Sequence, residues 1–170
     1  KTLFPYTTLF RSKIFQKIDE LPFDFERRRM SVIVKDDEGT VSMVTKGALE
    51  EMLNISTHVE YHGETIPLTE EIRQEVLTEV SQLNRQGLRV LGVGYKSHLR
   101  EGYAYTVTDE SDMILTGYLA FLDPPKPSAA PAIKALLEHG VKTKILTGDN
   151  EKVTQAICEK VGLDVEHILL

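Results

Sequence analysis

The stretch Asp123-Pro124-Pro125-Lys126-Pro127 divides the chain into two parts. Proline has no backbone N–H and its ring fixes φ, so three prolines in four residues cannot continue a helix or a strand ladder. The sequence pattern also changes here, from strand-rich segments to an alternation of helix and strand. We therefore interpret Asp123, Pro124 and Pro125 as a hinge between two domains, residues 13–122 and residues 123–170.

The part before the hinge has the pattern of an α+β domain with an antiparallel sheet and flanking helices. Two β-branched runs, 31–35 and 40–45, are separated by an acidic turn that ends at Gly39, which predicts a hairpin. The same kinds of pattern predict a short helix after residue 48, a hairpin over 59–66, a helix between Thr69 and Gly87, and strands over 89–95 and 113–122. The last strand is almost continuously apolar at its end, so we expect it to be central in the sheet.

The part after the hinge has the pattern of an α/β unit. A helix over 130–138 is followed by a strand over 141–146, a loop over 147–150 and a helix over 152–161. Alternation of this kind predicts a sheet with parallel strands.

The composition narrows the class of protein. The chain has 170 residues, 41% of them hydrophobic, and a net charge of −6. An acidic balance without a basic patch argues against a nucleic-acid partner. Cys158 is the only cysteine, which excludes a disulfide framework and a cysteine-based zinc site within the chain. No stretch approaches the roughly 20 apolar residues that a membrane-spanning helix needs.

The two ends of the chain carry expectations of their own. Residues 1–12 resemble the translation of a widely used DNA-sequencing adaptor, and they lack the apolar core and cleavage site of a secretory signal. We expect them to be a non-native leader; the alternative is a short native strand or tail. Residues 163–170 predict a helix exit that runs into an apolar segment. Because such a segment is normally buried, we expect both ends to be cuts.

The turn Thr147-Gly148-Asp149-Asn150 is a candidate for phosphate chemistry. It follows a predicted buried strand and starts a helix, and ligands bind at that edge of open parallel sheets. Gly148 lets a phosphate approach the backbone, and the carboxylate of Asp149 could orient a magnesium-bound water. The alternative is that Asp149 or Asn150 only caps the helix, and the turn alone favours the cap.

The segment Phe23–Ser31 is a candidate for nucleotide binding. It combines the rings of Phe23 and Phe25 with three consecutive arginines that end at Arg29. An aromatic ring can stack on a base while a guanidinium pairs with phosphate. The alternative is a solvated basic turn beside two core phenylalanines, which the segment alone favours.

Lys46-Gly47 and Arg89 are further candidate anion contacts. Lys46 and Gly47 lie at a predicted strand-to-helix junction, and Arg89 lies at the start of a predicted strand. The spacing around Lys46 is not that of a P-loop. The alternative for Arg89 is a surface charge. The 5 histidines show no metal-ligand spacing, and Cys158 lies among apolar helix positions, which indicates core packing.

Each of these signals is weak alone, but their order along the chain resembles a known family. An aromatic-arginine turn, Lys-Gly-Ala, Gly-Leu-Arg, Asp-Pro-Pro-Lys and Thr-Gly-Asp-Asn follow one another as in the cytoplasmic catalytic region of P-type cation ATPases. The resemblance runs from about Lys13 to Leu170. The variants at 23–32, 83–90 and 120–126 are most similar to the bacterial magnesium-importing branch.

The resemblance implies a fold, ligands and site residues. Residues 13–122 would be a nucleotide-binding domain, and residues 123–170 part of a phosphorylation domain of the haloacid-dehalogenase type. ATP and Mg²⁺ would be the cofactors. The implied roles are adenine stacking for Phe23, a basic nucleotide contact for Arg28, lining of the adenosine pocket for Lys46 and Gly47, a phosphate contact for Arg89, the hinge for Asp123, and an approach to the terminal phosphate and its magnesium for Thr147, Gly148 and Asp149.

Other motifs of the family are absent from this sequence. The nucleophilic aspartate of Asp-Lys-Thr-Gly-Thr, the Gly-Asp-Gly-x-Asn-Asp motif and the transmembrane helices do not occur. We therefore expect weak ATP binding without formation of an aspartyl phosphate. The resemblance implies that the partners are ATP and the rest of the polypeptide, meaning the remaining phosphorylation, actuator and transmembrane domains, on the cytoplasmic side of a bacterial inner membrane.

The sequence leaves three alternatives open. The first is a P-type ATPase for calcium or protons, since cation selectivity lies in the membrane helices. The second is a freestanding nucleotide-binding module without catalysis. The third, a soluble phosphatase of the haloacid-dehalogenase type, is disfavoured because the sequence has no nucleophile motif.

Overall fold

The computed structural model describes residues 15–148 and 151–163, and their centre is a seven-stranded sheet. The strand order is β1-β2-β3-β6-β7-β4-β5, and every neighbouring pair is antiparallel except β4 and β7. The strands are β1 (Gln16–Asp24), β2 (Arg29–Lys35), β3 (Val41–Ala48), β4 (Ser56–Tyr61), β5 (Glu64–Pro67), β6 (Leu88–Lys96) and β7 (Met113–Leu122). The helices are α1 (Leu49–Ile55), α2 (Glu70–Arg85), α3 (Ala129–Glu138) and α4 (Glu151–Lys160), with a 3₁₀ turn, η1 (Val107–Asp109).

The α+β fold predicted for the residues before the Pro-rich stretch is confirmed. Both predicted hairpins form, as β2–β3 and β4–β5. Helix α2 begins after Thr69, whose hydroxyl accepts a hydrogen bond from the N–H of Ile72 at 3.4 Å. It ends before Gly87, which adopts a φ of 82° that favours glycine. Local signals in the sequence therefore located the ends of the longest helix.

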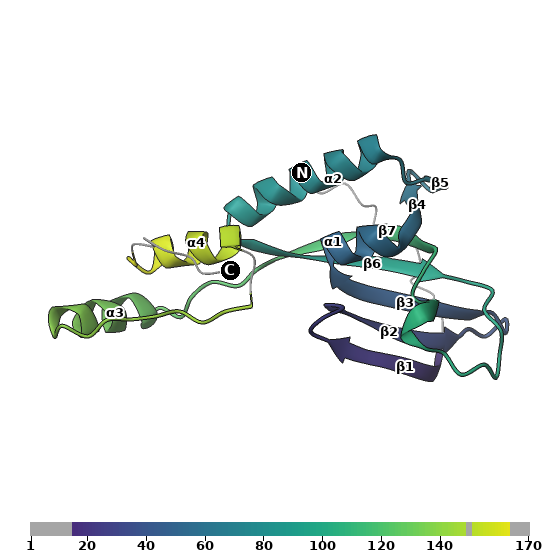
Figure 1. Cartoon of the computed structure of the whole chain (residues 1–170), viewed down its shortest axis with the longest axis horizontal. Coiled ribbons are helices and arrows are strands. Elements are labelled where there is room, and N and C mark those ends of the chain that lie inside the picture. The colour runs from purple at the N-terminus through teal and green to yellow at the C-terminus, as the bar shows by residue number, and fades with distance from the viewer. Residues whose placement is uncertain (1–14, 149–150, 164–170) are drawn as a thin grey trace, which may run out of the picture.

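Helices α1 and α2 lie on the same side of the sheet, whereas α3 and α4 lie beyond one end of the long strands β6 and β7 (Figure 1). The helix-covered face holds the core. Side chains alternate between the two faces along each strand, and those that point to the helix-covered face are the buried ones. One apolar cluster consists of Leu21, Ile33, Val41, Met43, Tyr105 and Met113. The other consists of Leu49, Met52, Leu53, Val59, Val80 and Leu115.

The position of β7 is only partly as predicted. Its first residues, Met113 to Leu115, lie between β4 and β6 and are central. The remainder pairs with β6 alone among the described strands, and the side chains of Leu119, Phe121 and Leu122 are about half exposed. The prediction of a central strand is therefore wrong for the second half of β7, because no described strand pairs with its other edge.

The segment after the Pro-rich stretch contains the two predicted helices but not the predicted strand. Helix α4 packs against α2, where Lys152 donates a hydrogen bond to Ser81 at 2.7 Å and Cys158 is buried, as predicted for a core position. Residues 141–146 are irregular. A strand requires a neighbour for its backbone N–H and C=O groups, and no described strand runs beside this segment. The parallel sheet expected there is thus not seen among the described residues.

The described residues include no helix that is both long and apolar enough to cross a bilayer. Residues 1–14, 149–150 and 164–170 lie outside the described part of the chain. The expectations for the leader, for Asp149 and Asn150 and for the apolar end therefore fall partly or wholly outside it.

Candidate functional site

The sheet has one face that no described helix covers, and we call it the open face. Side chains along β2 and β3 alternate between the two faces of the sheet. Those on the covered face, such as Ser31 and Thr45, are buried, whereas those on the open face, such as Met30 and Lys46, are partly or fully exposed. The register pairs Lys46 with Met30 on one side and with Val93 on the other. The ammonium of Lys46 therefore projects from a partly apolar surface, which suits a ligand with both a ring and a negative charge.

Phe23 lies at the edge of the open face. A register irregularity between Leu21 and Asp24 places Asp24 opposite Arg29, so that Phe23 turns to the same side as Met30. Phe23 is 52% exposed, and its ring meets the ring of Phe25 edge-on, with centroids 5.2 Å apart. The alternative of two core phenylalanines is wrong, since Phe25 is 88% exposed.

Arg28 does not lie with Lys46 in this structure. It occupies the tight turn between β1 and β2 with a φ of 48°, and its guanidinium donates to a carboxylate oxygen of Glu51 on α1 at 2.7 Å. The turn is fixed by Asp24, whose carboxylate accepts from the N–H of Arg27 at 3.0 Å and of Glu26 at 2.7 Å. These backbone hydrogen bonds, from Arg27 first and then Glu26, hold the pKa of Asp24 below its usual range.

Gly47 has a steric role next to the same turn. A Cβ at this position would lie 2.4 Å from the Cβ of Arg29 and 2.7 Å from the carbonyl oxygen of Arg28. Only glycine allows the turn to approach β3 this closely. Gly47 thus brings the turn that follows Phe23 against the strand that carries Lys46.

Arg89 lies on the same face of β6 as Val93, about 13 Å from it along the strand. Its register partner on β7 is Phe121. Its guanidinium lies 3.5 Å from the carboxylate of Asp123, so the structure brings together a predicted phosphate contact and the predicted hinge. Both side chains are exposed.

The remaining candidates lie apart from the sheet. Thr147 and Gly148 are exposed in the irregular segment before α4, and Asp149 is outside the described residues. Within the described part of the chain no group of three or more His, Cys, Asp or Glu side chains is arranged to hold a metal ion.

The sequence reasoning missed Glu110. This buried carboxylate accepts hydrogen bonds from Arg27 at 2.6 Å, from Ser31 at 2.7 Å and from Arg29 at 2.8 Å. Burial alone would raise the pKa of Glu110, but the hydrogen bonds from Arg27, Ser31 and Arg29 outweigh burial and hold that pKa below its usual range. The run of arginines in an acidic chain was the one available signal, because buried guanidinium groups require a carboxylate partner.

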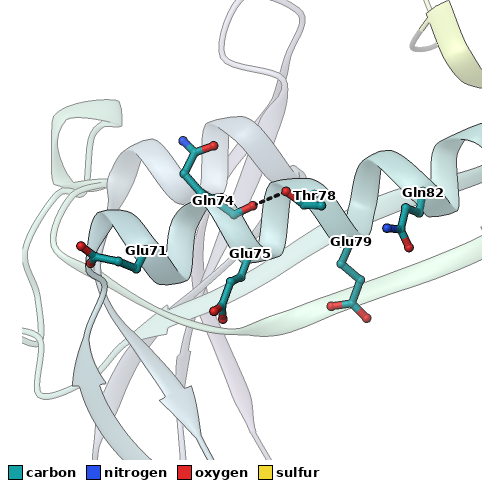
Figure 2. Close-up of a pocket in the computed structure, with 6 residues that line it drawn as sticks. All are labelled: Glu71, Gln74, Glu75, Thr78, Glu79 and Gln82. Atoms are coloured by element: carbon teal, nitrogen blue, oxygen red, sulfur yellow. Dashed lines mark hydrogen bonds between the residues drawn. The ribbon is translucent and has the colours of Figure 1, made fainter.

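A shallow hollow on α2 is a poor site for a phosphate. Figure 2 shows the six side chains that line it, all from this helix: Glu71, Gln74, Glu75, Thr78, Glu79 and Gln82. Three carboxylates along one helix repel an anion. The open face, with its lysine and arginine, is the better candidate for a nucleotide.

Comparison with known proteins decides the family. Residues 8–128 match the family model described as P-type ATPase, cytoplasmic domain N. The chain belongs to this family. The P-type ATPase match ends next to the Pro-rich stretch, so it covers the whole described sheet.

Individual relatives include ion-transporting P-type ATPases. The chain is 52% identical, over 92% of its length, to "Magnesium-transporting ATPase, P-type 1" of Salmonella typhimurium, and 50% identical to the protein of that name in Escherichia coli. It is 34% identical to a calcium-transporting ATPase of Listeria monocytogenes. The chain spans 17% of the length of the two magnesium-transporting relatives.

Proposed function

We propose that this chain is the nucleotide-binding region of a magnesium-transporting P-type ATPase and that ATP binds on the open face of the sheet. The observation that carries the proposal is the placement of Phe23 and Lys46 on one uncovered surface, in a chain 52% identical to magnesium-transporting relatives. An exposed ring offers a stacking surface for adenine. The ammonium of Lys46 offers a partner for the charge of the nucleotide.

The other site residues have more distant roles in this proposal. Gly47 keeps the turn after Phe23 close to Lys46, and Arg89 contacts a phosphate. Arg28 contacts the nucleotide only after its guanidinium leaves Glu51, and Arg89 would exchange Asp123 for phosphate. A cationic, partly aromatic surface fits ATP.

Residues 123–170 are proposed to begin a phosphorylation domain of the haloacid-dehalogenase type. In that arrangement Asp123, Pro124 and Pro125 form the hinge, and Thr147, Gly148 and Asp149 face the terminal phosphate and its Mg²⁺. The Asp-Lys-Thr-Gly-Thr motif does not occur in this sequence. The acceptor aspartate, the actuator domain and the membrane helices would then be supplied by the rest of the polypeptide, with this region on the cytoplasmic side of a bacterial inner membrane.

ATP binding by the 170-residue chain tests the proposal directly. We expect weak binding in an NMR titration, with amide shifts at Phe23, Lys46 and Arg89. Because base–aromatic stacking contributes roughly 1–3 kcal/mol, Phe23→Ala should weaken ATP binding about tenfold. Phe15→Ala removes another half-exposed ring and is the matched control, expected to bind as the wild type does. Absence of shifts at millimolar ATP would rule out the open-face site.

The transported cation is the less direct part of the proposal. The higher identity to magnesium-transporting than to calcium-transporting relatives, 52% against 34%, favours magnesium. We expect the full-length protein that carries this region to restore growth at low magnesium to cells without magnesium import. ATP hydrolysis stimulated by calcium instead would favour the calcium alternative.

A further inference from the structure

Glu110 is the one acidic residue in the buried class among residues 15–148 and 151–163, and its partners form a connected network. One carboxylate oxygen accepts from Arg27 and Arg29, and the other accepts from Ser31. A buried carboxylate is stable only when it is paired and hydrogen-bonded. The Glu110 network is therefore a buried, hydrogen-bonded part of the helix-covered side of the sheet.

Arg27 connects the Glu110 network to the backbone beside Phe23. Its guanidinium donates to Glu110 at 2.6 Å with one nitrogen and to the carbonyl oxygen of Pro22 at 2.8 Å with the other. Pro22 directly precedes Phe23. The guanidinium of Arg27 therefore bridges Glu110 and the backbone next to Phe23.

The network also lies directly behind Lys46. The hydroxyl of Ser31 is 2.8 Å from that of Thr45 on the neighbouring strand. Ser31 directly follows Met30 on β2, and Thr45 directly precedes Lys46 on β3. Met30 and Lys46 are residues of the open face. Alternation places these two pairs on opposite sides of the same piece of sheet. Glu110 is thus bonded to the reverse side of the proposed nucleotide surface.

We propose that Glu110 is a positioning residue for nucleotide binding, which acts through Arg27 to hold the Phe23 ring in place on the open face. This inference rests on the proposed function. A ring fixed before the ligand arrives does not have to be ordered on binding, so affinity for the base is higher. The proposed contribution concerns the base, because Arg27 links Glu110 to the backbone next to the ring of Phe23.

The test compares two probes on the 170-residue chain, ATP and inorganic tripolyphosphate, in NMR titrations well below the unfolding temperature. Glu110→Gln should weaken ATP binding about five- to tenfold and leave tripolyphosphate binding unchanged. In a Phe23→Ala background, Glu110→Gln should have no further effect on ATP. Glu101→Gln removes an exposed carboxylate from the same loop, paired with Lys35, and is the matched control.

Several outcomes of these titrations would overturn the role proposed for Glu110. Equal losses for both probes, or losses for Glu110→Gln and Phe23→Ala that simply add, would overturn it and leave the proposed function intact. Failure of the wild-type chain to bind ATP would overturn both. If Glu110→Gln does not fold, Arg27→Gln serves in its place, because it breaks the link to Pro22 and leaves the pair between Arg29 and Glu110. An unchanged ATP affinity in that variant would also refute the role of Glu110.

Discussion

The two faces of the sheet are built from the same strands, yet they have different chemistry. On the covered face, Met52 of α1 and Leu115 of β7 are buried completely or nearly so, and Glu110, the only buried carboxylate among the described residues, is paired with arginines. On the open face, Lys46 and Phe23 are exposed among partly exposed valines. Because side chains alternate along a strand, one parity stabilises the domain while the other is free to bind a ligand. Substitutions on the two faces should therefore have separate effects.

The largest expected difference concerns side-chain truncation on each face. Met52→Ala should lower the free energy of unfolding by about 3 kcal/mol, because it leaves a cavity in a fully buried cluster between α1 and the sheet. Leu119→Ala, on the open face of β7, should change it by no more than about 0.5 kcal/mol. Urea unfolding followed by circular dichroism measures both. Similar losses for the two variants would mean that the open face is covered in solution.

Sequence patterns predicted the covered face well where the signals were local. The cap of α2 at Thr69, its end before Gly87 and both hairpins are set by residues a few positions away in the sequence. The Glu110 network was missed because its partners are 79 to 83 residues distant, and no local pattern marks such a contact. Residues 141–146 were predicted as a strand from the alternating helix and strand pattern after the Pro-rich stretch, whereas a strand also needs a partner for its backbone groups.

The sequence predicted candidate residues that lie on the open face, but not the face itself. Phe23, Lys46 and Arg89 were chosen as candidates, and the register places them on one uncovered surface. The sequence alone favoured burial of the two phenylalanines, because apolar residues are more often inside. The register irregularity that turns Phe23 outward depends on the pairing of β1 with β2, which no single-strand pattern encodes. The pairing of Arg28 with Glu51 is likewise a tertiary contact.

A smaller effect should arise where the two faces meet at Gly47. Gly47→Ala places a Cβ within 3 Å of backbone atoms of Arg28 and Arg29, so the turn or β3 must shift. We expect a loss of about 2 kcal/mol in the free energy of unfolding, together with weaker ATP binding. Gly148→Ala is the matched control, since a Cβ there meets nothing within 4 Å, and it should change stability by no more than about 0.5 kcal/mol. A stable Gly47→Ala variant would show that the close approach is not required.

The smallest effect distinguishes two neighbours on β7 that face opposite sides, Tyr118 and Leu119. Tyr118 packs against the covered cluster, and burial first, then a hydrogen bond to Glu79, raises its pKa to about 12. The unfolded chain loses this proton near the ordinary pKa of 10.0, so the folded state binds more protons between pH 10 and 12. Stability from this source is complete below pH 10 and is lost as pH rises toward 12.

Unfolding free energies measured from pH 8 to 11 should therefore fall more steeply for the wild type than for Tyr118→Phe. Glu79→Gln should reduce the difference without removing it, because burial of the ring remains; parallel curves for the wild type and Tyr118→Phe would place Tyr118 in solvent, as Leu119 is.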